Sequence, residues 1–345
     1  MRKLVGLLAT VGLTAAIVVG YGNKSLYAEN TNDPNAAPNP YRMEELRVQM
    51  PNGRTLGAPI GVEIDHSDGK TLWLYERCGG DTCVGSTVDP VMKLDTSGKV
   101  VANFGGGLVN WPHGFYVDHA GDVWVTDGRG ENGKGHTVIK FSPDGKVLMT
   151  LGKPGQAGDA PGMFDTPSDV ITASNGDILV ADGHGVLQGH QTNDRMVKLS
   201  KDGSFIMAWG KHGSAPGEFD VPHSLALDSA GQLYVGDRSN NRVQVFDQSG
   251  KFIAEWKQFG RPSSVYIDKN DTIYVADSQS DDKTNPGFKQ GIRIGSVKDG
   301  KVAAFIPLTD PAVGSAEELA VDDQGNVFAG FTAQGKMAVR KFVKN

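Results

Sequence analysis

The sequence has few of the features that would assign it to a simple class. Two cysteines in 345 residues exclude a disulfide-rich scaffold. The lack of a basic tract, together with a formal net charge of −6, argues against a nucleic-acid partner. Little of the chain has the apolar spacing of an amphipathic helix, which excludes a helical bundle. Glycine, by contrast, is abundant, with 46 residues, and this indicates an all-β fold rich in turns.

The main long apolar run lies at the N-terminus. Residues 1–3 give a short basic start, residues 4–20 are apolar and Ala28 is a small residue suited to cleavage, so residues 1–28 are predicted to be a secretory signal peptide. The alternative is an uncleaved membrane anchor, which needs about 20 apolar residues to span a bilayer. Residues 29–42, rich in Asn and Pro, are predicted to be a flexible leader. We expect a secreted or periplasmic protein without stable membrane insertion.

The two cysteines, Cys78 and Cys83, lie close together in the segment RCGGDTC. In an exported chain a small disulfide loop is the favoured interpretation, and two free thiols are the alternative. A metal site built from this pair alone would be short of ligands.

One phrase recurs along the rest of the chain. A short β-rich run opens the phrase and usually ends in Asp, and a Gly turn leads to a second run, a polar loop and two further runs. Each run alternates apolar and polar residues, which is typical of strands. The openings are 40 to 55 residues apart, as expected for four-stranded propeller blades, and they are Pro59, Pro112, Pro167, Pro222, Pro262 and Ala316.

The two ends of the array indicate how it closes. The sixth repeat stops at Asn345 after three runs, and residues 46–57 (LRVQMPNGRTLG) resemble the missing fourth run. A solenoid of stacked sheets is the alternative, but an N-terminal strand that completes the last blade closes a ring and removes an exposed edge. We therefore predict one all-β domain over residues 43–345, a six-bladed β-propeller closed by its N-terminal strand, and we expect a monomer.

The residue after each opening lies at one height around the predicted channel. In alternate blades it is His113, His223 and Glu317, and between them lie Ser168 and Ser263. Three side chains about 120° apart can meet at one ion. Two imidazoles and a carboxylate suit Zn²⁺ or a similar divalent metal with an open position, as in catalytic sites. The alternative is that these residues only hydrogen-bond to channel water.

A second aligned position lies at the end of the second run. Arginine follows it in only two repeats, at Arg77 and Arg238, where a guanidinium could hold an anionic substrate group. An ion pair with a neighbouring acid is the alternative. His184 lies in a polar loop just after this position and is a candidate base. The position itself carries acids that we interpret as structural acceptors of turn N–H groups, namely Glu76, Asp127, Asp182, Asp237 and Asp277.

Several segments resemble known families. DRSNNRVQVFD, residues 237–247, is similar to the NHL repeat. WPHGFYVD around His113, VPHSLAL around His223 and VGDRSNNR around Arg238 resemble motifs of peptidyl-α-hydroxyglycine α-amidating lyase, and LYER at Arg77 resembles a further segment of that family. That family is a six-bladed NHL-type propeller with a channel zinc and a structural calcium.

The resemblance implies zinc on His113 and His223 and assigns Arg77 and Arg238 to the active site. Two positions depart from the family pattern. Glu317 stands where the family has its third zinc histidine, and His184 stands where it has a proposed catalytic Tyr. Because histidine accepts a proton near neutral pH, the chemistry could persist or could have changed substrate.

The resemblance also implies a calcium site. By register, its ligands would be the backbone carbonyls of Val62 and Phe115 and the carboxylate of Glu318. Oxygen ligands of this kind are those that calcium prefers.

The first hypothesis is therefore an exported, metal-dependent lyase that cleaves the C–N bond of a small α-hydroxy amide, either a small molecule or a peptide. In it, the metal on His113, His223 and Glu317 is the electrophile, and His184 is the base. The two arginines hold the substrate carboxylate. The alternatives are a non-catalytic propeller that binds a protein or glycan in the envelope, and a calcium-dependent esterase or lactonase.

Overall fold

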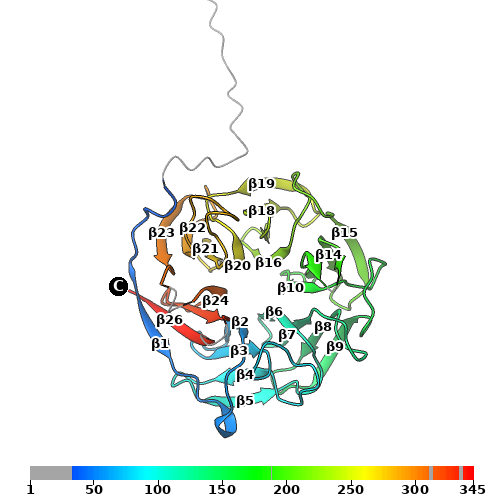
Figure 1. Cartoon of the computed structure of the whole chain (residues 1–345). Helices are drawn as coiled ribbons and strands as arrows, with labels where there is room; N and C mark the ends of the chain where they lie inside the picture. The colour runs from blue at the N-terminus through cyan, green and yellow to red at the C-terminus, as the bar shows by residue number, and fades with distance from the viewer. Residues whose placement is uncertain (1–32, 188, 311–313, 334–336) are drawn as a thin grey trace, which may run out of the picture.

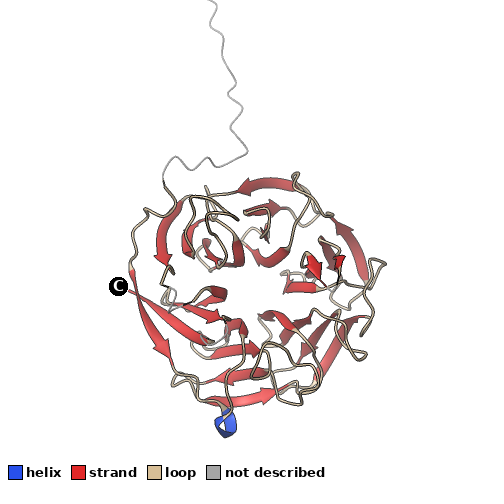
Figure 2. Ribbon diagram, in the orientation of Figure 1, coloured by secondary structure: helices blue, strands red, loops and turns tan. Residues whose placement is uncertain are grey.

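The computed structural model describes residues 33–187, 189–310, 314–333 and 337–345, so the predicted signal peptide lies outside the described residues. The described chain consists almost entirely of strands and turns, arranged as six sheets around a common centre (Figures 1 and 2). The helix among these residues is a short 3₁₀ turn, η1 (Pro51–Gly53). No helix in this part of the chain has the length and apolar character needed to cross a membrane.

Each sheet is a blade of four antiparallel strands, and the first strand of each blade lies nearest the centre of the ring. Blade 1 contains β2 (Pro59–Ile64), β3 (Leu72–Glu76), β4 (Val91–Leu94) and β5 (Val100–Phe104). Blade 2 contains β6 (Pro112–Val117), β7 (Val123–Asp127), β8 (Thr137–Phe141) and β9 (Val147–Gly152). Blade 3 contains β10 (Pro167–Thr172), β11 (Ile178–Asp182), β14 (Arg195–Leu199) and β15 (Phe205–Trp209).

The second half of the ring repeats this plan. Blade 4 contains β16 (Pro222–Leu227), β17 (Leu233–Asp237), β18 (Arg242–Phe246) and β19 (Phe252–Trp256). Blade 5 contains β20 (Pro262–Ile267), β21 (Thr272–Asp277), β22 (Gly291–Ser296) and β23 (Val302–Pro307). Blade 6 contains β24 (Ala316–Val321), β25 (Val327–Phe331), β26 (Ala338–Lys344) and β1 (Tyr41–Leu46). A separate two-stranded ribbon, β12 (Val186–Leu187) and β13 (His190–Gln191), lies in the loop between β11 and β14.

The hydrophobic core lies mostly between the blades rather than within one central mass. Among the described residues, six clusters of buried apolar side chains each join two neighbouring blades. At the interface of blades 1 and 2, for example, Tyr75 stacks on Phe115 with ring centroids 5.7 Å apart. Because every blade buries one apolar face against each neighbour, the ring must close for the first and last blades to be covered.

The ring closes through its N-terminal strand, as predicted. β1 pairs with β26 in an antiparallel register that runs from Tyr41↔Lys344 to Leu46↔Val339, and it forms the outer edge of blade 6 (Figure 1). The six-bladed all-β fold is therefore confirmed.

The predicted bounds of the closing strand are wrong. The sequence predicts this strand within residues 46–57, but most of that segment follows β1 and contains the η1 turn. The physical reason is the PNG sequence. Pro51 lacks a ladder donor, and Asn52 (φ 54°) and Gly53 (φ 67°) adopt left-handed backbone conformations.

The described part of the predicted leader, residues 33–40, contacts blade 5. Asn35 donates to the carbonyl of Gly287 at 2.7 Å and accepts from the Arg293 guanidinium at 2.8 Å. The carbonyl of Pro38 accepts from the amide of Phe305 at 3.0 Å. These contacts lead the chain directly into β1, which begins within the range assigned to the leader.

Tyr41 provides a test of ring closure. Its side chain is 6% exposed and packs in the cluster between blades 5 and 6, whereas Met43, two residues along β1, is 47% exposed. We expect Tyr41→Ala to lower the free energy of unfolding by about 3–5 kcal/mol. Met43→Ala should change it by less than about 0.5 kcal/mol. Urea unfolding curves of the two variants measure the difference, and equal losses would contradict a specific closing contact.

Candidate metal centre at one end of the channel

The second residue of every inner strand interrupts the regular pairing of its sheet. In all six blades the register between the inner strand and its neighbour shifts at this residue. Irregularities of this kind redirect a side chain out of the normal alternation. Three of the shifted residues are His113 of β6, His223 of β16 and Glu317 of β24, which therefore occupy equivalent positions in their blades.

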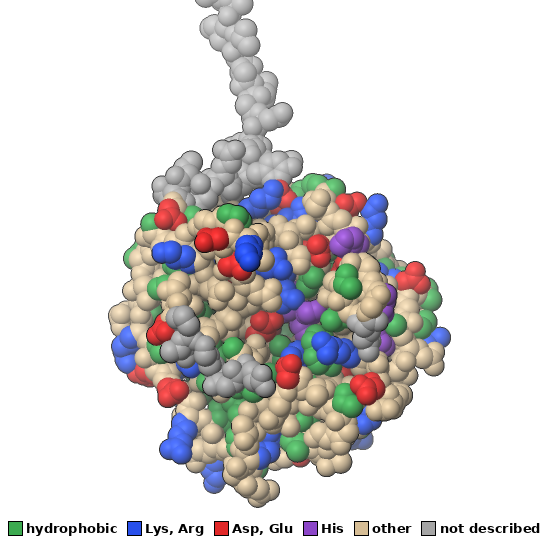
Figure 3. Space-filling model, in the orientation of Figure 1, with side chains coloured by type: hydrophobic (Ala, Val, Ile, Leu, Met, Phe, Trp, Pro, Cys, Tyr) green, Lys and Arg blue, Asp and Glu red, His purple; other side chains and the backbone are tan. Residues whose placement is uncertain are grey.

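Three imidazole rings meet at this end of the ring. The centroid of His113 lies 4.6 Å from that of His223 and 4.8 Å from that of His184, and His184 lies 5.2 Å from His223. One ligand nitrogen of each ring lies within 4.8 Å of the other two, as in a group that could hold a metal ion. In the same orientation as Figure 1, Figure 3 shows histidine side chains near the middle of the face, beside basic and acidic ones.

The hydrogen bonds of two of these rings show which ring nitrogen carries the proton. His113 Nδ1 lies 2.7 Å from the carbonyl oxygen of Ser168, and His223 Nδ1 lies 2.6 Å from that of Ser263. A carbonyl only accepts, so each Nδ1 donates its proton and each Nε2 is the unprotonated nitrogen with a lone pair. Metal-binding histidines are commonly held in this way, so these two residues fit a divalent metal. A backbone carbonyl has no residue-type signal, so the sequence could not indicate this role of the two serines.

Arg238 lies among the same groups. Its Nη1 contacts His223 Nε2 at 2.7 Å and Glu317 Oε1 at 3.2 Å, and its Nη2 contacts His184 Nε2 at 3.2 Å. A guanidinium only donates, so all three partners direct lone pairs toward it. The Nε of Arg238 is buried and has no hydrogen-bond partner among the described residues. Acceptors from three blades thus converge on one cation.

The three histidines are held in the neutral form. Burial lowers the pKa of each ring well below its usual value, and the nearby arginines Arg77 and Arg238 lower the pKa of His113 and His184 further. For His223, burial is followed by Arg238 and then by the other two rings. Burial lowers the pKa of Arg238 to about 10, which leaves it cationic at neutral pH. Neutral imidazoles are the form that binds metals.

Glu317 lies at the edge of this group. Its Oε1 is 3.3 Å from His223 Nε2 and 3.2 Å from Arg238 Nη1, and its Oε2 accepts from the Ser278 hydroxyl at 3.1 Å. Hydrogen-bond donors therefore hold both oxygens of the carboxylate. One of these oxygens lies 3.3 Å from the candidate ligand nitrogen of His223.

Arg77 lies beside the histidines but is paired with an acid. It forms the ion pair that we considered as an alternative, with Nη1 2.6 Å from Asp81, and its Nε donates to the carbonyl of Pro112 at 3.1 Å. Its guanidinium carbon lies 4.4 Å from the Trp111 ring centroid. Trp111 also packs edge-on against His184, so it links the arginine to the imidazole group.

Arg129 is a further residue of the site that the sequence did not lead us to expect. Its guanidinium carbon lies 4.3 Å from the Trp111 centroid, and its buried Nε has no hydrogen-bond partner among the described residues. Burial and the nearby Arg77 lower its pKa. Its place in the repeat could have indicated this role, because Arg129 follows Asp127-Gly128 just as His184 follows Asp182-Gly183. Two guanidinium groups thus pack on one tryptophan, an arrangement that could bind an anion.

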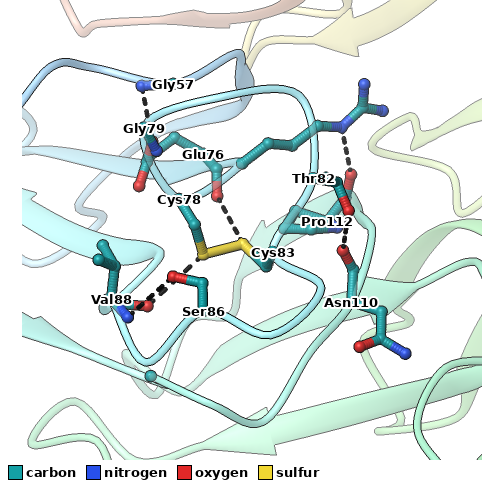
Figure 4. The surroundings of a disulfide bond; sticks show 12 residues. Gly57, Glu76, Cys78, Gly79, Thr82, Cys83, Ser86, Val88, Asn110 and Pro112 are labelled. Carbon is teal, nitrogen blue, oxygen red and sulfur yellow. Dashed lines mark hydrogen bonds between the residues drawn. A yellow bond between two sulfur atoms is a disulfide. The ribbon is translucent and has the colours of Figure 1, made fainter. Parts of the chain in front are cut away.

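The predicted disulfide is confirmed and shapes this surface. Cys78 and Cys83 are bonded, and Cys83 and Thr82 both contact the carbonyl of Asn110 in the loop before β6 (Figure 4). The bond closes the loop that carries Asp81, the partner of Arg77. The disulfide therefore fixes a loop of blade 1 against blade 2 next to Trp111.

The residues assigned to calcium lie one or two positions further along the inner strands than His113, His223 and Glu317. Val62, Phe115 and Glu318 line one cavity of about 1270 Å³. His113, His184 and His223 do not line it. Two further acids of this cavity, Glu63 and Asp169, were not anticipated. Asp169 is the third residue of its inner strand, as Glu318 is, so the repeat alignment could have predicted that the two acids lie close together.

The acids of this cavity have strongly shifted pKa values. Burial raises the pKa of Glu63 to about 8 and that of Asp169 to about 7. Burial, followed by repulsion from Asp169, raises the pKa of Glu318 well above its usual value. No ion pair joins these three acids to a basic side chain in the described part of the chain, and acids gathered in this way are suited to a divalent cation.

The acids at the ends of the second strands are structural, as interpreted. Asp127 accepts from the amides of Trp111 and Asn110 at 2.7 and 3.0 Å, which ties the end of β7 to the loop that precedes β6. Equivalent bonds to backbone amides hold the other four acids of this position, Glu76, Asp182, Asp237 and Asp277. Each of those four also pairs with an arginine, namely Arg54, Arg195, Arg242 and Arg293, respectively.

Comparisons with known proteins agree with this architecture. The NHL repeat family matches residues 219–246, which cover the inner three strands of blade 4. The chain is 40% identical over 154 residues to NHL repeat-containing protein 3 of Homo sapiens, covering 43% of each chain. A gluconolactonase from Xanthomonas campestris has a similar fold, with a TM-score of 0.57, 16% identity and coverage of 88% of this chain and 89% of that one.

Two other relatives have names that concern peptide amidation. Peptidyl-glycine alpha-amidating monooxygenase B of Xenopus laevis is 32% identical over 312 residues, which are 83% of this chain and 33% of that protein. A probable peptidyl-alpha-hydroxyglycine alpha-amidating lyase of Caenorhabditis elegans is 38% identical over 152 residues, or 43% and 40% of the two chains. The matches span less than half the length of each of these curated relatives. The chain is thus a six-bladed propeller with an NHL repeat in blade 4, and it resembles the amidating lyases.

Asp127 leads to a prediction about pH. Burial raises its pKa to about 6, so as the pH rises from about 3.5 to 6.5 the unfolded chain loses this proton before the folded chain does. The contribution of Asp127 to stability therefore falls by about 3 kcal/mol over that range. We expect Asp127→Asn to gain about this much relative to the unmodified protein as the pH rises, measured by urea unfolding. The exposed Asp144, whose pKa the Ser142 hydroxyl lowers, is the control, and Asp144→Asn should show no such gain.

Proposed function

We propose that this chain is an exported, metal-dependent lyase that cleaves the C–N bond of a small α-hydroxy amide similar to a peptidyl-α-hydroxyglycine. The observation that carries the proposal is the group of three neutral imidazoles and one buried arginine in a propeller that resembles the amidating lyases. The disulfide supports an oxidising compartment. Net negative charge supports a partner other than nucleic acid, and we expect the protein to act as a monomer.

His113 and His223 would hold Zn²⁺ or a similar divalent metal, with a third ligand from the adjacent side chains. When bound, such a metal polarises a substrate oxygen and favours loss of its proton. The two unprotonated Nε2 atoms, in rings held by Nδ1 bonds to backbone carbonyls, support this role.

The arginines would bind the substrate carboxylate. The sequence assigns this to Arg77 and Arg238, and the position of Arg129 beside Arg77 on Trp111 adds a third candidate. A carboxylate can accept two parallel hydrogen bonds from one guanidinium, which fixes its orientation as well as its position. The Nε atoms of Arg129 and Arg238, which have no partner among the described residues, leave donors for such a ligand.

A base must accept the proton of the α-hydroxyl group. As that proton leaves, the C–O bond becomes a carbonyl, the C–N bond breaks, and the nitrogen takes its electron pair and a proton to become an amide. His184 and Glu317 are the two adjacent groups able to hold the proton, and the sequence assigns the base to His184 and the third metal ligand to Glu317.

We also propose a structural calcium ion further along the inner strands, bound by the carbonyls of Val62 and Phe115 and the carboxylate of Glu318. The acids Glu63 and Asp169 in the same cavity support a cation there. Calcium would relieve the repulsion among these buried carboxylates and would connect blades 1, 2 and 6.

The lyase proposal is tested by metal content and product release. Protein purified without a chelator should contain about one equivalent of zinc-like metal and release glyoxylate from an N-acyl-α-hydroxyglycine. The double variant His113→Ala/His223→Ala should lose both, with activity reduced by more than about 100-fold. His66→Ala, at an exposed histidine of the cavity that holds the acids, is the control and should retain both.

A metal content that is absent, or unchanged in the double variant, would leave the non-catalytic binding propeller as the better hypothesis. Hydrolysis of a lactone without glyoxylate release would favour the esterase.

The calcium proposal is tested by thermal unfolding. Calcium at about 100 times its Kd should stabilise the protein by about 2–3 kcal/mol. Glu318→Gln should abolish most of this effect, because it removes the charged ligand, whereas Glu44→Gln on the exposed face of β1 should retain it. Equal stabilisation of the Glu318→Gln variant by calcium would rule out this ligand.

A further inference from the structure

We propose that in this chain the metal is bound by three imidazoles, those of His113, His184 and His223, and that Glu317 is the proton acceptor. This exchanges the roles of His184 and Glu317 relative to the sequence-based assignment. It rests on the proposed function for its chemistry, but the ligand set is testable by metal binding alone.

The distances favour His184 as the third ligand. One ligand nitrogen from each of His113, His184 and His223 lies within 4.8 Å of the other two. Four ligands around Zn²⁺ at about 2.0–2.1 Å lie about 3.4 Å apart. Movements of about 1 Å, together with displacement of the Arg238 guanidinium from the Nε2 atoms of His184 and His223, would therefore complete a three-histidine set.

The hydrogen bonds of His184 favour the same conclusion. Its Nε2 accepts from Arg238 Nη2, just as Nε2 of His223 accepts from Nη1 of the same guanidinium, so both lone pairs face one centre. The backbone amide of His184 donates to the Thr192 hydroxyl at 2.7 Å, and the ring packs edge-on against Trp111. The loop after β11 thus presents this ring to the other two in a fixed position.

The contacts of Glu317 suit a base better than a ligand. Oε1 accepts from Arg238 Nη1 at 3.2 Å and Oε2 accepts from the Ser278 hydroxyl at 3.1 Å, so donors on both oxygens hold the carboxylate beside the histidines. At the same time Oε1 lies only 3.3 Å from His223 Nε2, beside the place of the ion. A substrate hydroxyl at the open fourth position would lie within hydrogen-bond reach of this oxygen.

The proton then has a complete route. Glu317 takes the proton from the α-hydroxyl group as the carbonyl forms and the C–N bond breaks. The departing nitrogen receives the electron pair of that bond and then the proton from the Glu317 carboxyl. The products are an amide and an aldehyde, and no oxidant or reductant is needed.

Zinc affinity distinguishes the two ligand sets. Chelator-stripped protein is titrated with zinc in competition with a chromophoric chelator. We expect His184→Ala to weaken zinc binding by more than about 100-fold, as His113→Ala does, because each removes a direct ligand. Glu317→Gln should weaken it by less than about 10-fold while lowering kcat of glyoxylate release. The reverse order of zinc affinities would overturn the proposal.

A pair of cysteine variants gives a signal that does not depend on loss of binding. A thiolate bound to Co²⁺ produces an intense near-ultraviolet charge-transfer band. We expect this band in cobalt-loaded His184→Cys and not in cobalt-loaded Glu317→Cys, and the opposite pattern would overturn the proposal. If the unmodified protein binds no zinc, the proposed function fails with the inference. If zinc binds through Glu317, only the inference fails.

Discussion

The irregular pairing at the second residue of each inner strand is the feature on which the site depends. A regular strand would alternate its side chains between the two faces of the blade, where neighbouring blades bury them. The register shift frees one side chain per blade from that alternation and repeats it around the ring. Ring closure by β1 fixes the relative height of these six residues, so that His113 and His223 meet although 110 residues separate them.

The two ends of the inner strands have opposite electrostatic character. At one end, buried neutral imidazoles surround a single guanidinium, and lone pairs from three blades face it. Toward the other, burial raises the pKa values of carboxylates such as Glu63 and Asp169. Nitrogen donors suit zinc and oxygen donors suit calcium. One repeated strand therefore offers two chemically distinct sites along its short length.

Repetition makes much of this predictable from sequence. The spacing of the openings defines six blades, and register alone brings His113 and His223 to the same height of the channel. Contacts made by loops are harder to predict, because the path of a loop is not periodic. His184 and Arg129 follow second strands, and only the folded loops show which of them reaches the channel. The sequence places the closing strand too late, within residues 46–57, although Pro51 and Asn52 of that segment favour a turn. The strand is Tyr41–Leu46.

The two departures from the lyase pattern are best understood together. Taken singly, a carboxylate in place of the third histidine changes the charge of the ligand set, and a histidine in place of the catalytic tyrosine removes a phenol. In the structure these two residues lie on either side of Arg238, which contacts both. Under the proposed assignment, the imidazole in blade 3 would supply the third ligand and the carboxylate in blade 6 would accept the proton. The pair of changes would then retain three ligands and one base, with their positions exchanged across the channel.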